Sequence, residues 1–87
     1  MQQIMTAIDP QKRIVKAHIE LAIAQFGTER ALADAAGISQ PSINRAKHRG
    51  IVGHEVAAAI DRATGGKVQK STLRPDIWPP EKERANG

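Results

Sequence analysis

The side chains best suited to chemistry gather in one short segment, residues 39–49, which combines amides, hydroxyls and cations and contains no acid. A glutamine side chain can pair with the N6/N7 edge of adenine, and an arginine with the O6/N7 edge of guanine. Gln40 and Arg45 are therefore candidate readers of DNA bases. Serine, asparagine, lysine and histidine side chains suit phosphate oxygens, which hold a protein in register without reading the sequence.

A helix over this segment would sort these side chains onto two faces. Each residue of an α-helix turns by about 100°, so Ile43 and Ala46 can share a buried side. The opposite side then carries Pro41, Asn44, Arg45 and His48, flanked by Ser42 and Arg49. A basic face without acids favours a polyanionic partner, although an ordinary solvated helix face can look the same.

Such a helix needs a supporting helix, and residues 28–38 meet the demands of a helix-turn-helix. Gly37 supplies a turn residue that tolerates positive φ, and Ala33 is small where the two helices would touch. The positions that must be buried are Leu32, Ala36, Ile38, Ile43 and Ala46. Thr28 caps the supporting helix, and the free backbone N–H groups there could bind a phosphate. We therefore predict a helix-turn-helix over about 28–50.

Helices are also predicted before and within this unit. Asp9 and Pro10 form a helix start, and Gly27 ends a helix of about sixteen residues. Its buried side is predicted to hold Val15, Ile19, Ala22 and Phe26. In the second helix, the predicted buried residues are Ala31, Leu32, Ala35 and Ala36. The third helix is capped by Ser39 and ends at Gly50.

The remainder of the chain predicts one clear helix and one ambiguous segment. The clear helix covers about 53–64, with Val56, Ala57 and Ile60 inward. Residues 67–74 could form a short strand or a helical turn from Ser71, and we favour the helical turn. Ile77 and Trp78 are expected to fold back onto the core, where Trp78 could fill a gap or anchor a dimer. We predict one domain over 1–79 and a disordered polar tail over 80–87.

The composition limits the fold and the class of partner. The 87 residues are 40% hydrophobic and include one Phe, one Trp and no Tyr, so one small core must be built from short side chains. Such a core favours an all-α fold of about five short helices. The formal net charge of +4 is compatible with a nucleic-acid partner.

Several other classes of chemistry find no support in the sequence. The absence of cysteine excludes disulfides and thiol chemistry, and suggests a cytoplasmic setting. His18, His48 and His54 lack the spacing and companions of a metal site, so we expect no metal and no cofactor. No nucleophile–base set, glycine-rich phosphate loop or carboxylate pair indicates an enzyme. Arg74 and Asp76 are expected to form a local ion pair. No signal peptide or membrane-spanning run is evident.

The residues of the predicted helix-turn-helix resemble those of the Cro family of lambdoid phage repressors. The resemblance runs from Phe26-Gly27-Thr28 through Gly37 to Gly50. Its most similar part carries Gln40, Ile43, Asn44, a basic residue at 45, Ala46, His48 and Gly50. It implies an operator-binding repressor in which Ser39, Gln40 and Arg45 approach bases, while Asn44 and His48 lie near phosphate. Pro41 departs from this pattern because it replaces a small hydroxyl residue, leaving only apolar contact, such as with a thymine methyl group.

The downstream segments 63–68 and 73–79 resemble YdaS-type, Cro-like prophage proteins. Residues after Gly50 read as helical and not as Cro strands, so the strand-mediated dimer of Cro is not carried over. We therefore expect a lambda-repressor-like, all-α DNA-binding domain. The predicted base contacts are Ser39, Gln40, Pro41, Ser42 and Arg45. The predicted phosphate contacts are Thr28, Asn44, Lys47, His48 and Arg49.

These observations predict a sequence-specific transcriptional regulator that binds a double-stranded DNA operator as a homodimer, because one small domain buries a modest area on DNA. The rival prediction is an antitoxin-type interaction module that neutralises a partner toxin, since YdaS-type proteins have been described as antitoxins. Both roles could coexist. A non-specific architectural DNA binder is a further alternative.

Overall fold

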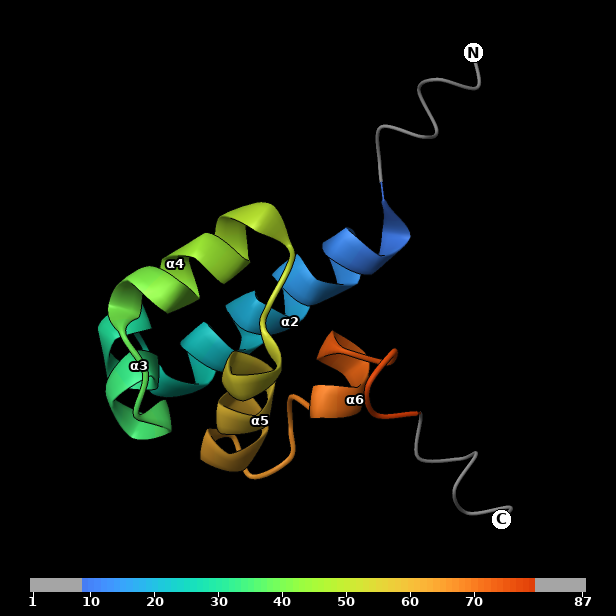
Figure 1. Ribbon diagram of the computed structural model, residues 1–87. Coiled ribbons are helices and arrows are strands. Elements are labelled where there is room, and N and C mark those ends of the chain that lie inside the picture. The colour runs from blue at the N-terminus through green and yellow to red at the C-terminus, as the bar shows by residue number, and fades with distance from the viewer. Residues whose placement is uncertain (1–8, 80–87) are drawn as a thin grey trace.

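The structure, a computed structural model, describes residues 9–79, and this part of the chain folds into five helices without a strand (Figure 1). The helices are α2 (Pro10–Phe26), α3 (Glu29–Ala36), α4 (Gln40–Arg49), α5 (His54–Ala63) and α6 (Lys70–Leu73). The all-α prediction with about five helices is confirmed. The predicted tail over 80–87 lies outside the described residues, as does 1–8. Within 9–79, no helix is long and apolar enough to cross a membrane.

The predicted starts of the first three helices are confirmed by side-chain caps. The Asp9 carboxylate accepts a hydrogen bond from the backbone N–H of Gln11 at 2.9 Å. The Thr28 hydroxyl accepts one from Ala31 at 3.0 Å, and the Ser39 hydroxyl accepts one from Ser42 at 3.2 Å. Each contact satisfies a backbone donor that the first helical turn leaves without a partner. Local sequence therefore determines where these helices begin.

The core lies among the five helices, with α2 packed against α3, α4 and α6, and α5 packed against α3 and α6. It is built almost entirely from small and branched aliphatic side chains. Its members are Val15, Ile19, Ala22, Leu32, Ala33, Ile43, Ala46, Val52, Ala57, Ile60, Val68 and Leu73. In Figure 1, α4 lies on one side of α2, while α5 and α6 lie on the other. Because every helix contributes to this one core, the position of α4 is fixed by the whole domain.

Two of the predicted buried positions are wrong. Ala35 is exposed, whereas Ala33 is buried together with Leu32 and Ala36. The three buried residues share the side of α3 that faces the core, and Ala35 is turned away from it by the helical twist. Ile77 is 41% exposed and does not fold onto the core. Three other residues predicted to be inward are half-buried and pack against the core: Phe26, Ile38 and Val56. Ala31, also predicted to be buried, is half-buried.

The ambiguous segment 67–74 contains a short helix, as favoured, but this helix begins one residue before Ser71. The Asp61 carboxylate of α5 accepts a hydrogen bond from the backbone N–H of Lys70 at 2.8 Å, which stabilises the earlier start. Trp78 packs half-buried against the core, and the Lys70 ammonium lies 5.2 Å from the centre of its ring.

The predicted local ion pair of Arg74 and Asp76 is confirmed, with a nitrogen–oxygen distance of 2.8 Å. The same guanidinium donates a hydrogen bond to the backbone carbonyl of Val52 at 3.0 Å. Arg74 therefore links the C-terminal turn to the segment that follows α4.

Candidate nucleic-acid interface

The connection between α3 and α4 has the geometry that a helix-turn-helix requires. Gly37 adopts the left-handed conformation, with φ of 73°, and ends α3. The backbone N–H of Ile38 donates to the carbonyl of Ala33 at 3.0 Å, which closes the turn tightly. Leu32 and Ala33 of α3 are buried in the same core as Ile43 and Ala46 of α4. The helix pair is thus compatible with a helix-turn-helix.

The outward face of α4 carries the residues that the helical angle predicts. Pro41, Asn44, Arg45 and His48 are all exposed. The face is directed away from the core because Ile43 and Ala46 occupy the opposite side. This face can therefore contact a partner without rearrangement of the core.

One edge of α4 is bound to α3 through a single carboxylate. Glu29, in the first turn of α3, accepts hydrogen bonds from Gln40 Nε2 at 3.4 Å and from Asn44 Nδ2 at 3.3 Å. Its second carboxylate oxygen accepts a hydrogen bond from the ammonium of Lys47 and forms an ion pair with it. Residues 40, 44 and 47 follow one another at helical spacing, so all three face Glu29.

These contacts alter the acidity of both charged groups. The hydrogen bond from Lys47 holds the pKa of the Glu29 carboxyl below its usual value; burial opposes this, and hydrogen bonds from Gln40 and Asn44 reinforce it. The pKa of Lys47 is raised, mainly by the same hydrogen bond and to a smaller extent by the charges of Glu29 and Glu20. Both side chains are mostly buried, with exposed fractions of 15% for Glu29 and 25% for Lys47.

The sequence reasoning missed the part that Glu29 plays in this interface. Residues 39–50 contain no acid, and Glu29 was interpreted only as a favourable residue in the first turn of a helix. The available signal was the spacing of Gln40, Asn44 and Lys47 along one edge of α4. Because the acid comes from the other helix, the predicted interface is less positive than the sequence of α4 suggests.

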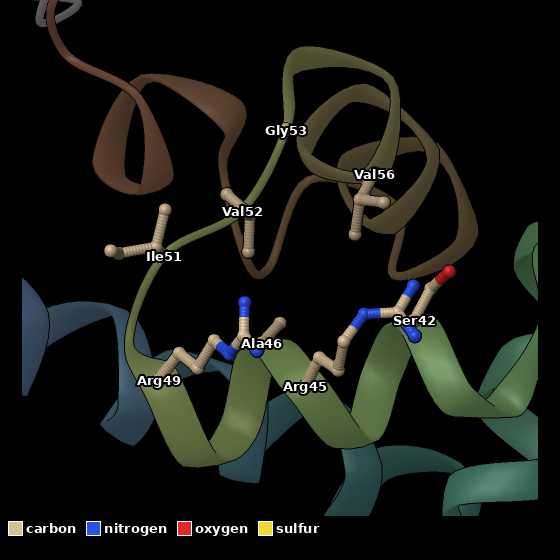
Figure 2. Close-up of a pocket in the computed structure, with 8 residues that line it drawn as sticks. All are labelled: Ser42, Arg45, Ala46, Arg49, Ile51, Val52, Gly53 and Val56. Atoms are coloured by element: carbon tan, nitrogen blue, oxygen red, sulfur yellow. The ribbon is translucent and has the colours of Figure 1, made fainter.

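The other edge of α4 remains cationic. Arg45 and Arg49 form no ion pair within residues 9–79. Figure 2 shows both side chains beside a groove between α4 and the chain that continues into α5. The groove has a volume of about 180 Å³ and is lined by Ser42, Arg45, Ala46, Arg49, Ile51, Val52, Gly53 and Val56. Two guanidinium groups one helical turn apart suit a row of phosphates or a guanine edge.

Of the two predicted hydroxyl contacts at the start of α4, Ser39 caps the helix and Ser42 is hydrogen-bonded to the Ser39 hydroxyl. The Ser39 hydroxyl accepts from the backbone N–H of Ser42, and the two hydroxyl oxygens lie 2.8 Å apart. The Thr28 hydroxyl caps α3 in the same way. Thr28 lies at the start of α3, and Ser39 and Ser42 lie at the start of α4. A ligand that contacted these hydroxyls would bind groups that already take part in hydrogen bonds within the protein.

The cationic side chains in the last turn of α4 also stabilise the helix itself. Lys47, His48 and Arg49 form its last turn, where cations stabilise the negative end of the helix dipole.

Among residues 9–79, no group of three or more His, Asp and Glu residues could hold a metal ion. The Nδ1 atom of His18 lies 2.8 Å from the carbonyl oxygen of Ile14, a contact within its own helix.

The comparisons with known proteins give one family. The family model described as "Bacterial toxin YdaS" matches residues 19–81, from the middle of α2 through α6. Comparison with curated proteins and with solved structures gives no significant match.

Proposed function

The chain belongs to the bacterial toxin YdaS family, and we propose that it is a sequence-specific DNA-binding regulator that inserts α4 into the major groove of an operator. One observation carries this proposal: the exposed face of α4 adjoins a cationic edge and stands on a helix pair that fits a helix-turn-helix. An α-helix presented in this way can enter the major groove, where each base pair has a distinct pattern of donors and acceptors.

Within this proposal, Arg45 is the principal base reader. It lies on the outward face, it is exposed, and no carboxylate within residues 9–79 pairs with it. Pro41 would offer apolar contact to a thymine methyl group, and Ser39 and Ser42 would approach bases from the first turn. Arg49 and His48 would contact phosphates near the other end of the helix.

Glu29 gives the proposed interface a defined shape. By accepting hydrogen bonds from Gln40 and Asn44, it holds two amide side chains in place before DNA arrives. An amide held in this way loses less conformational entropy on binding a base edge. Lys47 can then exchange its ion pair with Glu29 for a contact with phosphate, while Thr28 presents the N-terminus of α3 to the backbone.

The test is a footprint on the promoter region next to the gene for this chain. The wild type should protect a defined site, and Arg45→Ala should lose protection at the same concentration. Lys67→Ala removes one positive charge from an exposed position beyond α5 and serves as the matched control. Binding everywhere without a defined site would indicate an architectural binder, and no binding at low salt would contradict the proposal.

The family description favours a second candidate function, participation in a toxin–antitoxin pair. The description names the toxin of such a pair, whereas the antitoxin-type module predicted from the sequence would be the partner that neutralises a toxin. The discriminating experiment is co-expression with a neighbouring toxin gene. Rescue of growth that survives Arg45→Ala would favour neutralisation through protein contact, whereas rescue that is lost with Arg45 would favour repression.

A further inference from the structure

Helix α2 has a second apolar face that the core does not cover. Ile14 is 40% exposed and Leu21 is 57% exposed, and Ala17 and Ala24 are exposed on the same side. The spacing of these four residues is three, four and three, so they form one row, called here the α2 stripe. Val15, Ile19 and Ala22 occupy the opposite, buried side of the helix. Isolated apolar residues are normal on a surface, but a continuous row is characteristic of a contact site.

The surface along the α2 stripe is hollowed at two places. One surface hollow of about 430 Å³ is lined by residues that include Ile14, Ala17 and His18. A second hollow of about 420 Å³ lies between α2 and the segment after α5, and it is lined by Leu21, Ala24, Gln25, Lys67 and Val68. The two hollows follow one another along the same helix. An extended apolar partner, such as another helix, fits this shape better than a compact ligand does.

Contacts on the two sides of α2 show where the stripe lies relative to α4. On one side the backbone of Lys12 touches α4, since a Cβ added to Gly50 would lie 2.7 Å from the Lys12 carbonyl oxygen. On the other side Gln11 donates to the carbonyl of Thr72 at 3.3 Å, and Gln25 donates to that of Thr64 at 3.4 Å. The stripe is therefore bordered by α4 on one flank and by the α5–α6 region on the other.

Three charged residues lie on the α4 flank of the stripe: Arg13, which lines the hollow beside Ile14, and two residues of opposite sign, Lys16 and Glu20. Lys16 and Glu20 are both exposed and are separated by one helical turn. Glu20 lies close enough to α4 for its charge to raise the pKa of Lys47, an effect smaller than that of Glu29. No ion pair joins Lys16 to Glu20 within residues 9–79. Each of the two is thus available to a group on another chain.

We propose that the α2 stripe binds the α2 stripe of a second copy of this chain, with the two helices antiparallel about a two-fold axis that passes between Ala17 and His18. This axis places Ile14 against Leu21 of the second copy, and Leu21 against Ile14. It also places Lys16 beside Glu20 of the second copy, twice over. The small side chain of Ala17 beside the axis allows the helices to approach closely. The stripe therefore matches itself in both shape and charge, as an interface between identical subunits must.

The antiparallel arrangement also has a consequence that rests on the proposed function. The two-fold axis is perpendicular to both α2 helices, so it brings the same flank of each copy to the same side of the dimer. Both α4 helices then lie on one side, as two half-sites of one operator require. A parallel pair would place them on opposite sides. The four residues of the α2 stripe span only about 15 Å of helix. The interface is therefore small, and the dimer should be weak in the absence of DNA.

The test uses the absence of cysteine in the chain, because a single introduced cysteine can form a disulfide only between copies. Ala17→Cys should give a covalent dimer on mild oxidation, since a disulfide needs Cβ atoms about 4 Å apart. Ala35→Cys, at an exposed position of α3, is the matched control and should remain monomeric. Equal cross-linking of both variants, or of neither, would overturn the proposal. A stripe covered by residues 1–8 of the same chain would leave Ala17→Cys uncoupled and the wild type monomeric.

A second measurement tests the pairing itself. Sedimentation equilibrium without DNA should show a dimerisation constant at least tenfold weaker for Leu21→Lys, which is exposed enough to leave folding intact. Lys16→Glu should weaken the dimer, and adding Glu20→Lys to it should restore much of the loss. If the double variant Lys16→Glu/Glu20→Lys dimerises as weakly as Lys16→Glu alone, the antiparallel register is contradicted. Since no DNA is present, failure here would leave the proposed DNA binding standing.

Discussion

The Glu29 carboxylate of α3 accepts a hydrogen bond from the Lys47 ammonium of α4, so the supporting helix neutralises one of the three Lys and Arg charges of α4. The contact joins two residues that are 18 positions apart in sequence. It also divides α4 into an edge bound to an acid and an edge that keeps its positive charge.

The stability of the protein should depend on the charge of Glu29 at low pH. The pKa of Glu29 is lower in the folded protein than its ordinary value of 4.5, so its stabilising effect is complete above that value and is lost as the pH falls through the folded pKa. In thermal melts, the wild type should exceed Glu29→Gln by a few degrees near neutral pH, and the gap should shrink as the pH falls below 4.5 and close once the pH is below the folded pKa. A gap that is constant with pH would show that the charge of Glu29 plays no part.

Lys47→Ala should weaken DNA binding to a similar degree on all sequences and reduce the slope of the salt dependence by up to about one unit. The substitution removes a proposed phosphate contact and leaves the Glu29 carboxylate unpaired beside the DNA. The double variant Lys47→Ala/Glu29→Gln should therefore bind more tightly than Lys47→Ala alone. Titrations at several salt concentrations provide both readouts. An unchanged slope would exclude a phosphate role for Lys47.

Arg45→Ala should reduce specific affinity by about 1–3 kcal/mol and relax the preference at one base pair of each half-site. Binding to a set of operators with single base changes measures this directly. Lys67→Ala should leave the preference unchanged. A loss of equal size on every sequence would make Arg45 a phosphate contact instead.

Gly50→Ala should destabilise the fold more than Gly37→Ala. Both glycines have positive φ, which costs an alanine about 1–2 kcal/mol. At Gly37 the added Cβ meets open space, whereas at Gly50 it would lie 2.7 Å from the backbone oxygen of Lys12. Relieving that clash must separate α2 from the end of α4, adding about 1–3 kcal/mol. Urea unfolding of the two variants gives the difference, and equal costs would show that α2 and α4 are not held this closely.

The start and end of each helix could be predicted because their causes are local. Asp9, Thr28 and Ser39 each cap the helix that follows within three residues, and Gly37 needs no distant partner to adopt positive φ. The outward face of α4 was predictable for the same reason, because Ile43 and Ala46 fix its rotation. The start of α6 was missed by one residue because its cap comes from Asp61, nine positions earlier.

The features that escaped prediction depend on how helices cross. Glu29 reaches Gln40 and Asn44 only because α3 and α4 meet at a tight turn. The α2 stripe escaped notice because its apolar residues are interleaved along the chain with the apolar core residues Val15, Ile19 and Ala22, and they form a separate row only on the helix surface. Ala35 was wrongly predicted to be buried because alanine is tolerated on both the buried and the exposed face of a helix, so its residue type does not indicate which face it occupies. Contacts between helices, and the surfaces that those contacts leave exposed, can be identified only from the assembled fold.

The most direct test of α4 in the major groove is guanine N7 methylation interference on the protected promoter site, because the N7 atom is exposed only in that groove. For the wild type, methylation of specific guanines should block binding in a pattern repeated in two half-sites. For Arg45→Ala, interference should disappear at one guanine of each half-site and persist at the others. Binding that is insensitive to N7 methylation throughout the protected site would contradict insertion of α4 into the major groove.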